Sequence, residues 1–248
     1  MQSLLYSLLA GLSTVLGALI LLFVGVPGKR FMSILLGFAG GVMTAISLFE
    51  LMPESLHHGN MATSLIGFAL GCALMYGIDS FLPHAHMSRS DELQIENPTS
   101  KNGCQMTYKR TGYLILIGIA LHNIPEGLAI GAGLEASPEL GLMIAVAIGL
   151  HNIPEGLAIA CPLRASGMPL WKIILYSLAA GLTMVVGTAI GLLIMNISPI
   201  FIGASLAFAA GAMVYIVVDE LIPQSYQLHH HLSILGIIIG IMVGFVLF

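Results

Sequence analysis

Eight strongly apolar runs of similar length follow one another along the chain. They cover about residues 3–26, 31–52, 61–82, 112–134, 139–162, 171–195, 200–222 and 231–248. A helix of about 20 such residues crosses a hydrocarbon core of ~30 Å. Only 8% of the residues are charged, compared with about 25% in an average soluble domain. The sequence therefore predicts an all-α integral membrane protein with eight transmembrane helices.

The Lys and Arg residues all fall between the first and second, third and fourth, or fifth and sixth runs, on one side of the predicted membrane. They are Lys29, Arg30, Arg89, Lys101, Lys109, Arg110, Arg164 and Lys172. Cytoplasmic loops collect Lys and Arg, so this side is predicted to be cytoplasmic and both termini to face outward. The polar segment of about residues 83–110 is predicted to be a cytoplasmic loop. We expect membrane lipid as a partner and no nucleic acid, since no strongly basic surface is present.

A unit of three runs occurs twice, and its second copy follows the first at a nearly constant offset. YSLLAGLSTVLGALI from Tyr6 matches YSLAAGLTMVVGTAI from Tyr176, and FAGGVMTAISLFELMPES from Phe38 matches FAAGAMVYIVVDELIPQS from Phe208. Five runs separate the starts of the two units, so the second unit enters the membrane from the opposite side. Inverted repeats of this kind are typical of transporters, with a binding site near the bilayer midplane.

The repeat predicts one transmembrane transporter domain over residues 1–248, with a 3+2+3 arrangement of helices. Its parts are repeat 1 at about 1–82, the loop at about 83–110, a central helix pair at about 111–162 and repeat 2 at about 168–248.

The central pair carries the same ten residues twice, LHNIPEGLAI at 121–130 and at 150–159. In each copy His and Glu are four residues apart, so both side chains lie on one helical face. Each charge at the bilayer centre costs roughly 2.5 to 3.5 kcal/mol on insertion scales, so such residues mark ion or substrate pathways. Pro125 and Pro154 remove a backbone donor, and we expect the helices to bend there and make room for an ion.

The two motifs face each other if the helices pack antiparallel, and they then offer two imidazoles, two carboxylates and two amide oxygens. The candidate ligands are His122, Asn123, Glu126, His151, Asn152 and Glu155. Two carboxylates neutralise one divalent ion, and mixed nitrogen and oxygen ligands suit zinc, iron(II), manganese, cobalt or nickel. The alternative is that each His bonds its own Glu or a backbone carbonyl and only clamps the two helices together.

The paired HNxPEG motifs, the FAxGxM and ELxP segments of the second and seventh runs, and LPHAH after the third run are similar to those of the ZIP family of divalent-metal transporters. The resemblance covers nearly the whole length and is closest to the bacterial broad-specificity branch. It implies transport of zinc, with iron, manganese, cobalt or cadmium as further substrates, into the cytoplasm across a bacterial inner membrane. It also implies a homodimer and no bound cofactor.

The resemblance implies that the six candidate ligands carry the metal and that Met43 contributes a thioether near the entrance. The other interpretation of Met43 is an ordinary packing methionine. It implies a cytoplasmic exit site, for which the candidates are Asp79, His84, His86, Asp219 and Glu220. Their other interpretation is solvated residues at helix ends. Glu50 and its repeat partner Glu220 could each serve one vestibule. His57, His58 and His229–His231 are interpreted as loop residues.

One position departs from the family pattern. Family members often have Glu in a GLxE setting in the sixth helix, where it would seat a second metal, whereas this chain has Met184. We therefore expect one well-formed metal site.

Two other functions fit parts of the same pattern. An intramembrane metalloprotease is disfavoured because HNIPE lacks the second His and the general base of HExxH, so no enzyme activity is expected. A proton-coupled transporter of a small organic ion, with His and Glu as a proton relay, is the alternative function.

Overall fold

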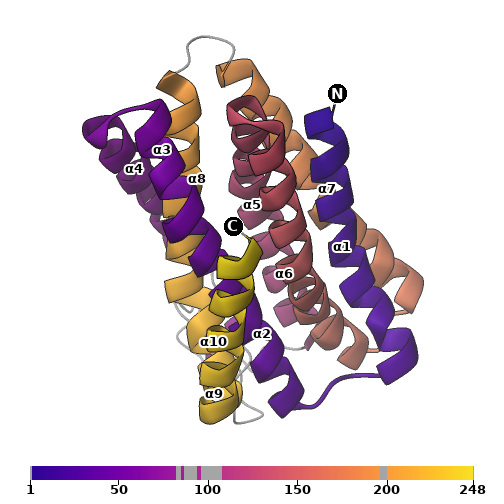
Figure 1. Cartoon of the computed structure of the whole chain (residues 1–248). Coiled ribbons are helices and arrows are strands. Elements are labelled where there is room, and N and C mark those ends of the chain that lie inside the picture. The colour runs from indigo at the N-terminus through magenta and orange to yellow at the C-terminus, as the bar shows by residue number, and fades with distance from the viewer. Residues whose placement is uncertain (1, 82–84, 87–93, 96–107, 196–199, 248) are drawn as a thin grey trace.

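The computed structural model describes residues 2–81, 85–86, 94–95, 108–195 and 200–247 (Figure 1). The helices in chain order, with η marking a π-helical segment, are α1 (Gln2–Val24), α2 (Lys29–Ala45), η1 (Ile46–Leu51), α3 (Met52–His58), α4 (Met61–Phe81), α5 (Tyr108–Ala136), α6 (Pro138–Ala165), α7 (Leu170–Met195), α8 (Ile200–Ile216), η2 (Val217–Leu221), α9 (Ile222–Leu228) and α10 (His230–Leu247). Two short strands, β1 (Ala85–His86) and β2 (Gln94–Ile95), pair antiparallel within the predicted loop.

The described residues form eight helical spans long and apolar enough to cross a membrane, as predicted. The second span runs from Lys29 to His58 and the seventh from Ile200 to Leu228, so both continue beyond the predicted ends at 52 and 222. His57 and His58 therefore lie in a helix rather than in a loop, and so do His230 and His231 in α10.

Each of these two long spans passes a proline by widening into a π-helical segment. The N–H of Met52 donates to the carbonyl of Ser47, five residues back, and the N–H of Ile222 donates to that of Val217. A proline follows directly in both cases. Its ring would clash with the carbonyl four residues back in a regular helix, and the wider turn accommodates this without ending the span.

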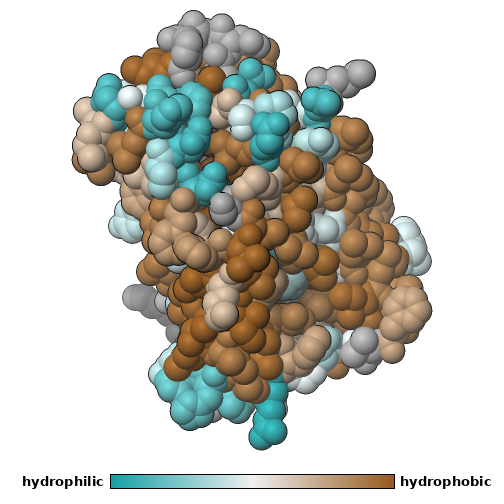
Figure 2. Space-filling model, viewed as in Figure 1, coloured by the Kyte–Doolittle hydropathy of each residue, from teal (hydrophilic) through white to brown (hydrophobic). Residues whose placement is uncertain are grey.

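The outer surface of the bundle is apolar over its middle. Figure 2 shows hydrophobic residues across the central belt of this face and hydrophilic residues near both ends. Large apolar side chains are exposed on all eight spans, for example Leu9 on α1, Leu70 on α4, Leu193 on α7 and Phe245 on α10. A belt of this kind is what lipid contact requires, because the bilayer interior solvates apolar side chains and not polar ones.

The central helices α5 and α6 pack against each other, and each also packs along one helix that begins a predicted repeat. α5 contacts α7, α6 contacts α1, and α1 also contacts α7. The remaining spans pair as α2 with α10 and α4 with α8. The two groups meet where α5 contacts α8 and where α6 contacts α2. The candidate ligands on α5 and α6 therefore lie inside the bundle.

Close helix contacts occur in matched pairs, each made by a glycine. A Cβ on Gly127 of α5 would overlap the carbonyl oxygen of Met184 on α7, and a Cβ on Gly156 of α6 would overlap that of Thr14 on α1. Thr14 and Met184 occupy equivalent positions in the two copies of the repeat, and the two glycines occupy equivalent positions in the two motifs. Small residues allow such close backbone approach between membrane helices.

The outer pairs of helices are matched in the same way. A Cβ on Gly71 of α4 would overlap the carbonyl oxygen of Phe208 on α8, and a Cβ on Gly240 of α10 would overlap that of Phe38 on α2. Phe38 and Phe208 are again equivalent in the repeat alignment. The contact between α2 and α10 therefore repeats the contact between α8 and α4, with the two repeats exchanged.

Candidate metal centre

The hairpin of α5 and α6 brings the two motifs together. Only Ser137 separates the helices, and its Oγ caps α6 by accepting a hydrogen bond from the N–H of Leu140 at 3.1 Å. Both helices run without interruption through Pro125 and Pro154. Because the connection is so short, the helices must run antiparallel and remain in contact.

Three of the six candidate ligands converge between these helices. Glu126, His151 and Glu155 each offer one ligand atom, and these three atoms all lie within 4.8 Å of one another. The shortest separation is 3.1 Å, between His151 Nε2 and Glu126 Oε1. All three residues are buried, with exposed fractions of 0 to 2%. The cluster is therefore small enough to surround one ion and is shielded from water and lipid.

The backbone fixes how His151 is oriented. Its Nδ1 lies 3.2 Å from the carbonyl oxygen of Ala147, which can only accept, so Nδ1 carries a hydrogen. The Nε2 atom then points at Glu126. An unprotonated Nε2 and a carboxylate are both acceptors, so a proton or a metal cation has to lie between them. An imidazole held through its other nitrogen by a carbonyl is the usual arrangement of a histidine that binds metal.

Four buried oxygen atoms around this cluster have no hydrogen-bond partner among the described residues. They are Oε2 of Glu126, Oε2 of Glu155, Oδ1 of Asn123 and Oδ1 of Asn152. Leaving a buried acceptor unsatisfied costs about 1 to 3 kcal/mol, and more for a charged group. A divalent cation would compensate these oxygens.

The two Asn side chains are held by the neighbouring helices. Asn123 Nδ2 donates to the carbonyl oxygen of Ala180 on α7 at 2.8 Å, and Asn152 Nδ2 donates to that of Ala10 on α1 at 3.2 Å. Ala10 and Ala180 are a further pair of equivalent repeat positions. Because each amide nitrogen is bound outside the hairpin, each amide oxygen is directed away from that bond and remains available to a cation.

His122 lies apart from the three-residue cluster and faces another element. Its Nδ1 is 3.5 Å from Oε2 of Glu220 on η2, and both side chains are nearly buried, at 6% and 11% exposed. The sequence motif alone could not show this contact, because it depends on how α8 and η2 pack against α5.

A pocket lies beside His122 and Glu220, and the exit candidates Asp79 and Asp219 also line it. It is lined by Met75, Ile78, Asp79, Gly118, His122, Tyr215, Ile216, Asp219 and Glu220. The Tyr215 hydroxyl donates to Oδ2 of Asp79 at 3.1 Å. Asp79, Asp219 and Glu220 are thus brought together, whereas His84 lies outside the described residues and His86 is described only through the backbone of β1.

Met43 and Met184 are both fully buried, on α2 and α7. The carbonyl of Met184 lies directly over Gly127, one residue after Glu126. Met43 lies on α2, which packs against α6. The thioether predicted near the entrance is therefore on a helix adjacent to the central hairpin.

Together, eight membrane-spanning helices and a buried cluster of imidazole and carboxylate groups define a transporter for divalent metal ions. A family model described as "ZIP Zinc transporter" matches residues 81–248. The chain is 36% identical over 230 residues to the zinc transporter ZupT of Escherichia coli O7:K1 (strain IAI39 / ExPEC) and 37% identical to that of Enterobacter sp. (strain 638). In both cases the match covers 91% of this chain and 87% of the relative. The chain belongs to the ZIP family and is ZupT-like.

Membership in this family establishes a divalent-metal transporter and not an enzyme, with the metal as substrate rather than cofactor. The eight apolar spans of the described residues make it an integral membrane protein.

Proposed function

We propose that the chain moves zinc, and also iron, manganese, cobalt or cadmium, into the cytoplasm through a midplane site between α5 and α6. The observation that carries this proposal is the convergence of Glu126, His151 and Glu155 in a buried hairpin. Two carboxylates balance the charge of one divalent ion. One imidazole with several oxygens is a ligand set suited to these metals.

The remaining candidates extend this ligand set on both sides. The amide oxygens of Asn123 and Asn152 are buried without a partner among the residues described. His122 and Glu220 are proposed as the next binding position for the ion, between the cluster and the pocket. Glu220 is close enough to Glu155 for the two carboxylates to interact electrostatically. Met43, on α2, is proposed as a ligand that the ion binds before it reaches the cluster.

The 3+2+3 arrangement with inverted repeats is part of the proposal. The matched contacts support it: Gly11 and Gly181 are equivalent in the repeats, and each sits where a Cβ would overlap the carbonyl oxygen of the other. A contact that maps onto itself when the repeats are exchanged is expected at a pseudo-twofold axis. The three residues of the cluster lie on the two helices that this axis exchanges.

The orientation of the chain in the membrane is inferred from the charge distribution, and the inward direction of transport from the resemblance to the ZIP family. The described basic residues all lie at helix ends that share one side of the bundle: Lys29, Arg30, Lys109, Arg110, Arg164 and Lys172. That side is proposed to be cytoplasmic, with both termini outside. Asp79 is near the end of α4 on that side, so the pocket with Asp219 and Glu220, together with His84, is proposed as the metal exit. The apolar belt is proposed to contact lipid and the partner copy of a homodimer.

Replacing Asp79 and Asp219 together by asparagine is expected to lower zinc flux, roughly tenfold, because an acidic cleft raises local cation concentration by at least that factor. Binding at the central cluster should remain, since neither residue belongs to it. Flux into proteoliposomes and zinc-dependent thermal stabilisation check the two effects separately. Unchanged flux would remove these carboxylates from the pathway.

The proposal is tested by metal-dependent stability. Zinc is expected to stabilise the folded protein, by about 2.7 kcal/mol at a free concentration of 100 times Kd and further as the concentration rises. Magnesium should have little effect because it prefers an all-oxygen shell. Zinc flux into proteoliposomes completes the test. Stabilisation by a small organic ion and none by zinc would favour the proton-relay alternative instead.

A further inference from the structure

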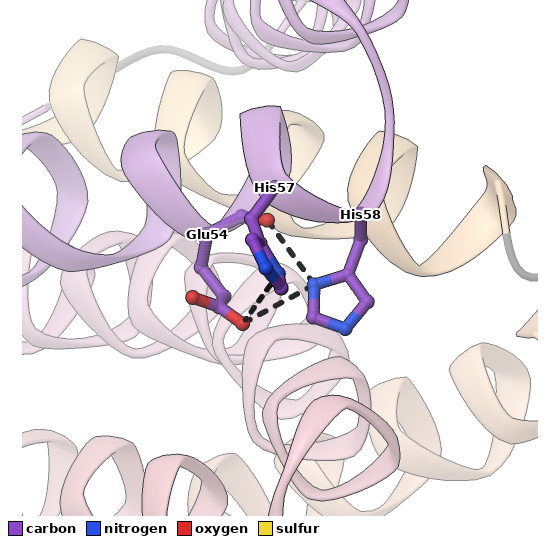
Figure 3. A group of neighbouring side chains, drawn as sticks. All are labelled: Glu54, His57 and His58. Atoms are coloured by element: carbon purple, nitrogen blue, oxygen red, sulfur yellow. Dashed lines mark hydrogen bonds and ion pairs between the residues drawn. The ribbon is translucent and has the colours of Figure 1, made fainter.

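A second group of metal-binding side chains lies far from the central hairpin, at the end of α3. Glu54 lies in the first turn of this short helix and His57 and His58 in its last, and the three side chains point toward one another (Figure 3). The Nδ1 atoms of His57 and His58 are 3.9 and 3.2 Å from Oε1 of Glu54. One ligand atom from each residue lies within 4.8 Å of the other two. We call these three residues the outer cluster.

The separations in the outer cluster match those between ligands of one metal ion. Zinc binds His nitrogen at about 2.0 to 2.1 Å and carboxylate oxygen at about 2.0 to 2.2 Å, so two ligands of a tetrahedral ion are about 3.4 Å apart. The observed 3.2 and 3.9 Å lie on either side of this value. The Nδ1 atom of His58 also lies 3.2 Å from the backbone carbonyl oxygen of Glu54, to which it donates a hydrogen bond (Figure 3). Binding an ion through this nitrogen therefore replaces that hydrogen bond, and binding through Nε2 requires rotation of the ring.

The local electrostatics also favour a cation. The cluster lies at the C-terminal end of α3, where the partial negative charge of the helix dipole attracts positive charge. The basic residues that the structure describes all belong to the opposite end of the bundle, whereas Glu135 and Glu139 join Glu54 at this end. The field at this end thus attracts divalent cations, and no described Lys or Arg lies near enough to repel them.

The exposure of the outer cluster indicates that a bound ion exchanges rapidly and that the cluster is not a structural metal site. The side chains of His57, His58 and Glu54 are 79%, 21% and 29% exposed. Three protein ligands leave a coordination position open to water, unlike the closed sets of structural zinc sites. An ion held here can leave readily. The adjacent carboxylate is Glu50, which is four residues earlier, in electrostatic contact with Glu54, and nearer the membrane interior.

We propose that Glu54, His57 and His58 form an outer capture site that binds a divalent transition-metal ion before it enters the pathway. The inference rests on the proposed inward transport and adds a first binding step to it. From this site the ion passes Glu50 on its way to the central cluster. If these side chains formed only surface ion pairs, there would be no reason for two imidazoles to lie beside one carboxylate at the acidic end of the bundle.

The test measures uptake of zinc by intact cells that express the full chain. With His57 and His58 both replaced by alanine, the half-saturating zinc concentration is expected to rise roughly tenfold or more, because even groups that only support a metal ligand contribute about 10- to 100-fold to metal affinity. The maximal rate should be unchanged, since the central cluster is intact. The matched control is His230→Ala with His231→Ala, a pair of adjacent histidines at the opposite end of the bundle.

Cobalt(II) binding to the purified protein tests the site directly. In a chain with Glu126→Gln and Glu155→Gln, the outer cluster should still bind one cobalt ion with the visible absorption of His ligation. Adding His57→Ala and His58→Ala should remove that ion, and the His230 and His231 replacements should not. Equal cobalt binding with and without His57 and His58, or an unchanged half-saturating concentration, would overturn the proposal. Failure of the central site would instead appear as equal zinc stabilisation of the unsubstituted chain and of the chain with Glu126→Gln and Glu155→Gln, with cobalt still bound at α3.

Discussion

Replacing Glu126 and Glu155 together by glutamine is expected to reduce zinc flux by at least roughly 100-fold, since even groups that only support a metal ligand contribute 10- to 100-fold to affinity or activity. Glutamine keeps the size of each side chain and one oxygen. It removes the two negative charges that balance a divalent ion, in a place where neither water nor lipid can replace them. Zinc flux into proteoliposomes at matched protein content measures the loss.

The same substitution should leave the protein folded. The two buried carboxylates repel each other when no cation is present, so their neutral replacements do not weaken the apo bundle. The control is Glu135→Gln with Glu139→Gln, the same chemical change at two exposed positions beside the turn between α5 and α6. That control should keep its maximal rate of transport, measured at saturating zinc. Flux retained in the Glu126 and Glu155 variant would exclude the hairpin as the transport site.

The number of membrane spans could be predicted from the sequence because the bilayer sets one length for every apolar run. The ends of the second and seventh spans could not be predicted in this way. Pro53 and Pro223 resemble helix ends, yet both helices continue because a π-helical segment precedes each proline. The same misinterpretation placed His57 and His58 in a loop. The spacing E-x-x-H-H, which places both histidines within one turn of Glu54, is the signal that could have revealed the outer cluster.

At the central site, the four-residue spacing predicted that His and Glu share a helical face, but it could not assign partners across helices. His151 meets Glu126 of the other copy, whereas His122 meets Glu220. The two copies have identical sequences, so this difference arises from their neighbours. α8 packs against α5 and leads into η2, which supplies Glu220, and that contact is a property of the whole bundle.

Replacing Gly127 by alanine is expected to destabilise the bundle strongly, by about 3 kcal/mol or more, the upper range for overpacking a well-packed interior. The added Cβ would overlap a backbone oxygen of α7, which cannot rotate away as a flexible side chain could. α5 and α7 would have to separate along their contact, and the hydrogen bond from Asn123 to Ala180 would be lost with it. Thermal unfolding in detergent measures the effect.

A glycine on the same helix provides the matched control for this prediction. Gly118 is also buried in α5, but a Cβ there would meet nothing within 4 Å, so Gly118→Ala should be neutral or slightly stabilising through its helix propensity. Gly156→Ala should match Gly127→Ala in size, because its Cβ would overlap the carbonyl of Thr14 in the equivalent contact. If Gly127→Ala were as stable as Gly118→Ala, the close contact between α5 and α7 would not limit how these helices pack. If the two motif glycines differed widely, the matched contacts would not be energetically equivalent, and the pseudo-twofold relation that places both helices at one ion would lose its support.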